Sequence, residues 1–316
     1  MWWVRMWDLK EAPTSLALVR ICVGLVMWGE LAWAGGVGVV DWLWAPAEAG
    51  GLIDVMSMKR VPLVYQILPA EPWAVWVIWG VAFVAAFCMM VGFFSRTSVL
   101  ITLLMSAQLA LINVPADRGI ELVLRDLLLI LCFARCGNAW SLDAWLKTGK
   151  WAGDGGLIPA WPRHLFILQL IVIYQIAGVS KFASVWWPDG EFTALYYVLV
   201  NPIYSRFALD WASTPLLQFS QVASALTLVF EWNAWILIPA YWFRYTYDRP
   251  GRLRALFNRI DVRRVYVFGG IALHLGIEGL MSLGAFALAM LAVYPAFFHP
   301  DEFHRAAAWF RGKLKR

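Results

Sequence analysis

Long runs of apolar residues, separated by short polar segments, occupy most of the chain. Within a run the apolar positions do not alternate with polar ones, so the pattern favours membrane-spanning helices over the strands of an outer-membrane barrel. A helix needs about 20 apolar residues to cross a hydrocarbon layer of about 30 Å. We therefore predict an all-α fold, a polytopic integral membrane helix bundle with about eight transmembrane helices. The predicted spans are residues 14–34, 73–94, 97–114, 119–137, 164–182, 215–243, 265–281 and 284–298.

The last apolar region, residues 265–298, allows two interpretations. It is either one over-long helix or two short helices separated at Ser282-Leu283-Gly284, and two helices fit the thickness of a bilayer better. The first run is long enough to span and has no small-residue cleavage pattern after it. We expect this run to remain in place as a signal anchor.

Composition excludes an ordinary soluble domain. Apolar residues make up 61% of the chain and charged residues only 15%, whereas about 25% of a typical soluble domain is charged. We treat residues 1–316 as a single transmembrane domain. Four cysteines lie within predicted spans, and we expect them to be buried apolar side chains rather than ligands of a metal. They are Cys22, Cys88, Cys132 and Cys136.

Arginine and lysine residues in the connecting segments set the predicted orientation. Segment 244–264 has seven arginines against two aspartates, and the tail after residue 304 is also basic. We expect both segments and both termini to be cytoplasmic, with loops 35–72 and 183–214 outside, in a bacterial-type inner (cytoplasmic) membrane. The net charge of +5 is then explained by contact with anionic membrane lipid, and no nucleic acid is needed as a partner. Basic residues near the termini include Arg5, Lys315 and Arg316.

Ionisable residues inside the predicted spans are costly in a bilayer and are usually paired or functional. A rise of about 1.5 Å per residue places most of them toward the outer face. This outer group comprises Glu30, Glu121, Arg125, Asp126, Lys181 and Glu278. Arg20, Glu231 and Arg135 fall toward the inner face, and His274 lies near the middle.

Two of these pairs have helical spacing. His274 and Glu278 are four residues apart, as are Glu121 and Arg125, so each pair shares a helix face. One interpretation is a substrate or proton network in a polar cavity open to the outside; the other is a set of structural ion pairs between or within helices. Arg20 and Glu231 have matching inner depth, and we predict that they form a structural intramembrane pair.

Four segments resemble a known family. They are APTSLALVRICVGL at 12–25, WSLDAWL at 140–146, QLIVIYQIAGVSKFASVWWPDG at 169–190 and LHLGIEGLMSLGAFALAML at 273–291. In order and spacing they are similar to the membrane domain of vitamin K-dependent γ-carboxylase. The wider group is the horizontally transferred transmembrane domain (HTTM) proteins, and the resemblance covers roughly residues 12–300.

The resemblance implies catalytic roles for two residues. In the carboxylase a lysine deprotonates vitamin K hydroquinone so that it reacts with oxygen, and a protein glutamate is then carboxylated. Lys181 in AGVSK matches that lysine, and His274 in LHLGIE matches a family histidine. The implied cofactor is a quinol of the vitamin K hydroquinone or menaquinol type. Ser180 stands where the carboxylase has a second lysine, and Glu121 stands where it has a functional histidine.

Two functions from different classes follow from this resemblance. The first is a quinol-dependent oxidase, epoxidase or carboxylase-like enzyme with Lys181 as the base in an outward-facing pocket. The second is a non-enzymatic accessory protein for the maturation or export of a secreted peptide, as in HTTM proteins of the SdpB type. The chain has no counterpart of the large lumenal domain of the carboxylase, so we expect hydroquinone oxidation or epoxidation rather than carboxylation of a docked protein substrate.

The surroundings of Lys181 decide between a base and an anchor. An amine at the edge of an apolar helix loses its proton more readily because desolvation disfavours the charged form. A lysine that reaches past Trp186 and Trp187 to the headgroups would stay charged and serve as an anchor. Gly178 and Ser180 leave room for another helix or a flat ring. We therefore predict that Lys181 faces the bundle interior, within reach of the helix that carries His274.

Overall fold

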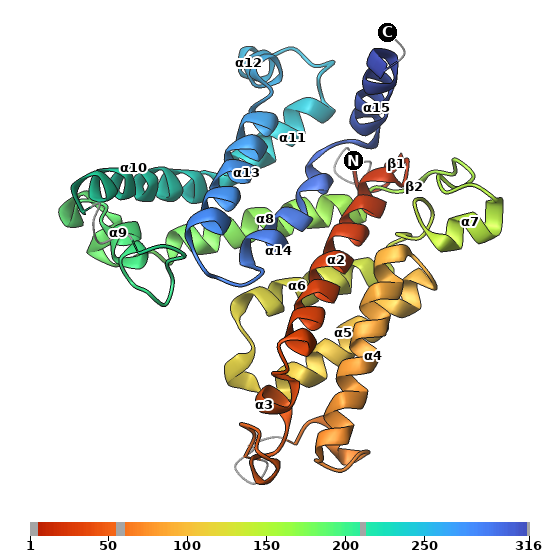
Figure 1. The fold of residues 1–316 in the computed structure, drawn as a ribbon. Coiled ribbons are helices and arrows are strands. Elements are labelled where there is room, and N and C mark those ends of the chain that lie inside the picture. Colours follow the sequence, from red (N-terminus) through yellow and green to blue (C-terminus); the bar gives the residue numbers. More distant parts are fainter. Residues whose placement is uncertain (1–5, 55–60, 209–212, 315–316) are drawn as a thin grey trace. The chain divides into compact units, whose positions relative to one another are not determined.

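The computed structural model describes residues 6–54, 61–208 and 213–314. Arg5, Lys315 and Arg316 lie outside the described residues, as do parts of both predicted outer loops. The described chain is mostly helical, which confirms the all-α prediction (Figure 1). It divides into two compact units, of which unit 1 combines residues 1–164 with 298–316 and unit 2 comprises residues 165–297.

Unit 1 is built around the apolar helices α2, α4 and α5. Its regular elements are β1 (Lys10–Glu11), α2 (Thr14–Gly36), α3 (Val40–Trp44), η1 (Ala47–Ala49), η3 (Leu63–Gln66), α4 (Pro72–Val91), α5 (Ser95–Ile112), η4 (Val114–Ala116), α6 (Gly119–Phe133), α7 (Leu142–Thr148), β2 (Ile158–Pro159) and α15 (Pro300–Leu314). A side chain at Gly24 of α2 would place its Cβ 2.7 Å from the Met90 Cα. This glycine therefore lets α2 and α4 pack backbone against backbone.

Unit 2 contains most of α8 and the segments that follow it. Its elements are α8 (Trp161–Val179), η5 (Ser184–Trp186), η6 (Pro188–Gly190), α9 (Ala194–Leu199), α10 (Ser213–Trp232), η8 (Ala234–Ile236), α11 (Leu237–Tyr245), α12 (Arg252–Ile260), α13 (Val262–Leu280), α14 (Phe286–Ala292) and η9 (Tyr294–Phe297). The last apolar region is thus two helices, α13 and α14, and the single over-long helix is excluded. Gly284, with a φ of 61°, lies in the turn between them.

Fewer helices than predicted have the length and apolarity to cross a membrane. Four in the described chain meet both conditions, namely α2, α4, α5 and α8. A fifth is added if the segment 213–245, which bends by 46° around Asn233, counts as one broken span. The prediction of about eight spans is therefore wrong, because apolar runs that look similar in sequence form shorter helices: α6 has 15 residues and α14 only 7.

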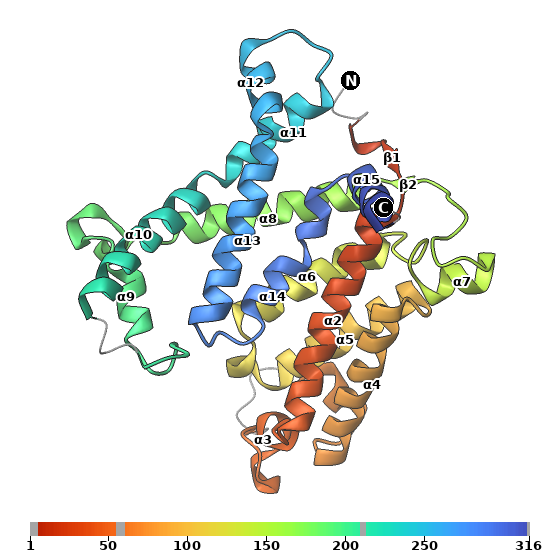
Figure 2. The same ribbon diagram turned by 45° about the horizontal axis from the view of Figure 1, so that its top comes forward.

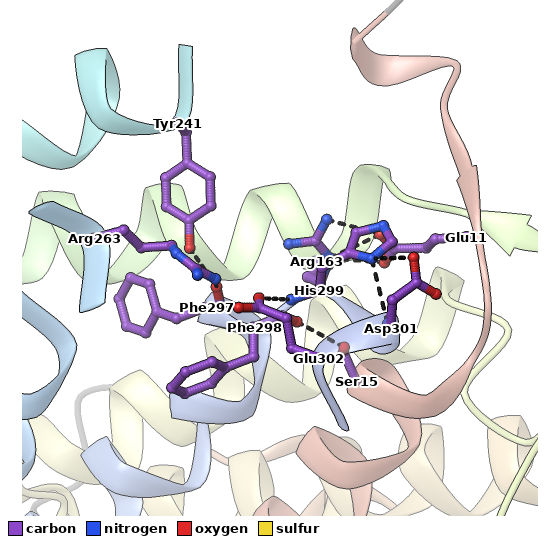
Figure 3. Close-up of polar contacts among 10 residues, drawn as sticks. All are labelled: Glu11, Ser15, Arg163, Tyr241, Arg263, Phe297, Phe298, His299, Asp301 and Glu302. Carbon is purple, nitrogen blue, oxygen red and sulfur yellow. Dashed lines mark hydrogen bonds and ion pairs between the residues drawn. The ribbon is translucent and has the colours of Figure 1, made fainter. Parts of the chain in front are cut away.

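Three segments that are far apart in sequence meet at one end of unit 1. The antiparallel pairing of β1 with β2 puts Lys10 opposite Pro159. At the start of α2, Thr14 Oγ1 lies 2.9 Å from His304 Nε2 of α15. Close by, Ser15 Oγ donates to the Phe298 carbonyl at 2.8 Å (Figure 3). The amino end, the 138–163 connection and the start of the basic tail therefore share one end of this unit.

Candidate functional site

Lys181 forms an ion pair with Glu231. The lysine lies just beyond the end of α8, and its Nζ contacts Glu231 Oε2 near the end of α10. The same Nζ lies 4.8 Å from the centroid of the Trp186 ring and 3.3 Å from the Ala177 carbonyl oxygen. The two side chains are only 15% and 11% exposed. Lys181 is thus turned onto a carboxylate inside unit 2 and is not extended away from the protein.

A glycine and two indoles hold this pair in place. A Cβ at Gly178 would lie 3.1 Å from the Glu231 Cβ and 2.9 Å from Trp232 Cδ1, so α10 approaches α8 where there is no side chain. The Trp232 indole donates to the Gly178 carbonyl at 2.9 Å, and the Trp187 indole donates to the Lys181 carbonyl at 2.8 Å. The small neighbour predicted beside Lys181 therefore accommodates a helix in this structure.

The structure gives Glu231 and Arg20 different partners from those predicted. Glu231 pairs with Lys181 inside unit 2, and Arg20 binds backbone carbonyls inside unit 1, which corrects the predicted Arg20–Glu231 pair. The inner depth assigned to Glu231 assumed one straight helix over 215–243. The helix instead bends after Trp232, and the end of α10 meets the end of α8. Glu231 therefore lies beside Lys181, although the two residues were predicted to lie toward opposite faces.

His274 is the centre of a buried polar cluster in unit 2. It is 2% exposed, and its Nε2 lies 2.6 Å from the hydroxyl of Tyr174 on α8. That hydroxyl is in turn 2.7 Å from the hydroxyl of Tyr294 on η9. Gly270, one turn before His274, allows this approach, since a Cβ there would clash with the Tyr294 hydroxyl at 2.1 Å. Among the described residues, His274 Nδ1 has no hydrogen-bond partner.

The ion pair and the histidine cluster adjoin each other. Phe230, next to Glu231, packs edge-on against Tyr174 at 5.1 Å between ring centroids and stacks on Tyr266 at 4.2 Å. The Tyr266 hydroxyl donates to the Phe230 carbonyl at 3.2 Å. Phe230 therefore places the ion pair beside the cluster of His274, Tyr174 and Tyr294.

The tyrosines of this cluster are absent from the sequence-based list of candidate residues. Charge was the criterion there, and an aromatic ring in an apolar run is most often ordinary packing. One signal was available, because Tyr174 precedes Lys181 by seven residues, two helical turns, inside the family-like segment of α8.

The predicted outer group forms separate ion pairs. In unit 1, Arg118 contacts both Glu30, at 3.2 Å, and Glu121. Arg125 makes a two-point contact with Asp117, at 2.8 and 2.6 Å, so the Glu121–Arg125 pair suggested by spacing is wrong. Asp126 lies half-buried on α6.

Glu278 does not join the histidine cluster. In unit 2 its carboxylate pairs with Arg206 at 2.6 Å, in a contact where the two side chains are 29% and 41% exposed. The helical spacing from His274 is correct, but the partners of the two residues differ.

Arg20 ties α2 to the end of α6. Its guanidinium is fully buried and donates to the carbonyls of Cys136, at 2.7 Å, and Trp140, at 2.5 Å. Nearby, Asp143 accepts hydrogen bonds from the backbone N–H of Ser95 at 2.8 Å and from its hydroxyl at 2.7 Å, at the start of α5. The WSLD segment and Arg20 thus form a fixed polar joint in unit 1.

Other buried polar contacts are structural as well. Figure 3 shows the guanidinium of Arg163 against the carboxylate of Glu11 in unit 1, a pair with Nη2 to Oε2 at 2.7 Å and each side chain 3% exposed. In unit 2, Arg263 and Tyr241 both donate to the Phe297 carbonyl, at 2.8 and 2.7 Å. The four cysteines are free, and within the described ranges no three His, Cys, Asp or Glu side chains are placed to hold a metal ion.

Comparison with known proteins gives a family. The model of the HTTM domain matches residues 10–301, nearly the whole chain. No solved structure matches the chain. The match includes both units and every residue of the ion pair and the histidine cluster, and the apolar helices have the properties that membrane crossing requires. This chain is a membrane protein that belongs to the HTTM domain family.

Proposed function

We propose that this protein is a membrane enzyme that removes a proton from a quinol, with Lys181 as the base. The observation that supports this most strongly is the contact of Lys181 with Glu231, close to His274 and Tyr174. A hydroquinone of the vitamin K or menaquinol type supplies an acidic phenolic O–H. Loss of the phenolic proton makes the ring reactive toward oxygen.

Glu231 gives Lys181 a way to act as a base. A charged pair in an apolar site gains little over a neutral one, because desolvation opposes the Coulomb attraction. When the proton passes from Lys181 Nζ to Glu231 Oε2, both groups become neutral. The free amine then accepts a proton, and Glu231 retains the first one until it is released.

The His274 cluster supports the same assignment. Of the two ring nitrogens of His274, Nε2 is hydrogen-bonded to the Tyr174 hydroxyl, and the buried Nδ1 has no hydrogen-bond partner among the described residues. Such an orphaned buried atom suits a hydroxyl or carbonyl of a quinol-type ligand. We infer that His274 orients the ligand and that an outward-facing pocket admits it.

A turnover assay tests this proposal. The full chain in nanodiscs is given a chemically reduced menaquinol or vitamin K hydroquinone, and quinone and epoxide are measured by chromatography with and without oxygen. Lys181→Arg keeps a cation for Glu231 but cannot act as a base, so we expect turnover to fall by at least about 100-fold. Lys147→Arg on the exposed part of α7 is the matched control and retains full turnover.

Two results would contradict the enzymatic proposal. One is full turnover in Lys181→Arg, which would remove the lysine from the chemistry. The other is an absence of turnover in the wild-type protein with both quinols, which would favour the accessory role in maturation or export of a secreted peptide.

We also propose an inner-membrane location with both termini cytoplasmic. The arginine-rich segment 244–264 supports this orientation, as does the meeting of the amino end and α15 at one end of unit 1. A cysteine in place of Glu48 in η1 should react with an impermeant thiol reagent in intact cells. A cysteine in place of Arg305 in α15 should react only after lysis, and the reverse pattern would invert the topology.

A further inference from the structure

A basic amphipathic helix in unit 2 contributes to neither the core nor the proposed chemistry. α12 connects α11 to α13 and lies at the end of the unit where α11 ends and α13 begins (Figures 1 and 2). All nine of its residues are described, and none of them is buried. An exposed helix at the end of a unit contacts either solvent or a surface outside that unit, such as a membrane or a partner molecule.

One face of α12 is apolar and exposed. Leu253, Leu256 and Ile260 are 57%, 50% and 52% exposed, and their spacing of three and four residues puts them on the same side of the helix. Beside this stripe, Phe257 packs edge-on against Phe243 of α11 at 5.3 Å between centroids. Asn258 Nδ2 donates to the Phe243 carbonyl at 3.0 Å. These contacts fix α12 on α11 and leave the stripe uncovered.

The charge around the stripe is positive. At the junction of α12 and α13, Asp261 is contacted by Arg264 at 3.0 Å, by Arg263 at 3.3 Å and by Arg244 at 3.6 Å. This carboxylate is therefore already neutralised. Arg252 and Arg259 on α12 itself are exposed. Seven residues make two helical turns, so both arginines lie along the same border of the stripe, two turns apart.

We propose that α12 lies in the headgroup region of an anionic phospholipid bilayer, with the leucine and isoleucine stripe among the acyl chains and Arg252 and Arg259 at the phosphates. A basic helix with an apolar face is the form that binds such an interface. α11, which precedes α12, ends the bent candidate span 213–245, so α12 follows a segment suited to cross the bilayer. An RNA partner would suit the arginines but would leave the apolar stripe in water. This inference does not depend on the quinol chemistry.

Fluorescent labelling of the full chain tests the placement. A cysteine at Leu256, or at Ala255 on the polar side as the matched control, is labelled with an environment-sensitive dye. The protein is placed in nanodiscs of phosphatidylcholine with increasing phosphatidylglycerol, and wild type treated with the same dye corrects for the native cysteines. We expect the dye at 256 to shift to the blue and to be quenched by a spin-labelled lipid as phosphatidylglycerol increases. The dye at 255 should stay accessible to iodide.

Charge variants test the arginines. Arg252→Gln and Arg259→Gln should each raise the phosphatidylglycerol fraction at half-maximal shift by about five-fold, and lysine at both positions should restore it. Arg305→Gln and Arg311→Gln on α15, each made singly, change the net charge by the same amount and should have no effect. Equal exposure of the dyes at 255 and 256, a shift independent of phosphatidylglycerol, or burial of the stripe by added RNA but not by lipid would each overturn the proposal.

Discussion

Arg20 in unit 1 and Lys181 in unit 2 are both cations on apolar segments, and the two units satisfy them differently. Arg20 donates to the backbone carbonyls of Cys136 and Trp140, which neither give nor accept a proton. Lys181 faces the carboxylate of Glu231, beside hydroxyls and an imidazole. The partners of a charge inside an apolar run therefore indicate whether it is structural, as for Arg20, or chemical, as we propose for Lys181. The run itself does not distinguish the two cases.

The largest expected effect is the loss of the arginine joint. Arg20→Gln leaves the carbonyls of Cys136 and Trp140 buried without a charged donor, so we expect the free energy of unfolding to fall by about 4 kcal/mol. Thermal and denaturant unfolding in detergent measure this. Arg135→Gln, an exposed arginine in the same connection, is the control and should behave like wild type. Unchanged stability in Arg20→Gln would show that Arg20 does not stabilise the fold, and the comparison with Lys181 would fail.

The next largest expected effect is the loss of stability when the Lys181–Glu231 ion pair is broken. Glu231→Gln leaves the ammonium of Lys181 unpaired in a mostly buried site, and we expect a loss of about 3 kcal/mol. Adding Lys181→Gln should recover most of this loss, because the double variant has no uncompensated charge. Glu278→Gln breaks the exposed pair with Arg206 and should cost less than about 1 kcal/mol. If the single and double variants were equally unstable, the two charges would not be coupled.

A smaller effect is expected at the hydroxyl between His274 and Tyr294. Tyr174→Phe keeps the ring and removes both hydrogen bonds, so we expect a loss of about 1–2 kcal/mol. Quinol turnover should fall as well if the cluster orients the ligand. Tyr197→Phe, at a tyrosine that is 59% exposed, is the control and should leave both quantities unchanged. Wild-type stability in Tyr174→Phe would show that the two hydrogen bonds of this hydroxyl do not stabilise the fold.

The smallest expected effect is a pH dependence of stability that comes from His299 in unit 1. Burial and the neighbouring Arg163 hold the pKa of His299 below its ordinary value, although Asp301, at 3.2 Å, opposes the shift. The unfolded chain therefore binds this proton first, and stability should decline as the pH falls through about 6.5. His299→Gln should flatten the decline in unfolding measurements between pH 8 and 5. An unchanged decline would assign it to another group.

Much of the helical framework follows from the sequence, whereas the pairing of charges does not. The apolar pattern predicts α2 from residue 14 to 34, and the helix extends over Thr14–Gly36. Gly178, three residues before Lys181, correctly indicates the close approach of another helix. Lys181 and Glu231 were assigned to opposite faces although they form a pair, because a hydropathy pattern contains no information about a bend within an apolar run. The hydropathy pattern also predicts too many membrane spans, because it does not define where a helix ends.

Charge partners were also set by loops that carry no periodic signal. Arg118 and Asp117 lie before α6, and they take the places that helical spacing would give to Arg125 and Glu121. The tyrosine hydroxyls of the His274 cluster are a further case, because their rings fit an apolar run as well as phenylalanine does. Such partners become visible only when the helices are placed in space.

The contacts of Thr14 and Ser15 with His304 and Phe298 have a consequence for biosynthesis. The first helix of unit 1 emerges from the ribosome early, and the segment that completes its hydrogen bonds is made only after all of unit 2. During synthesis the two hydroxyls must find water or temporary partners. Unit 1 therefore reaches its final form only after unit 2 has been synthesised, and α15 completes the contacts of α2 within unit 1.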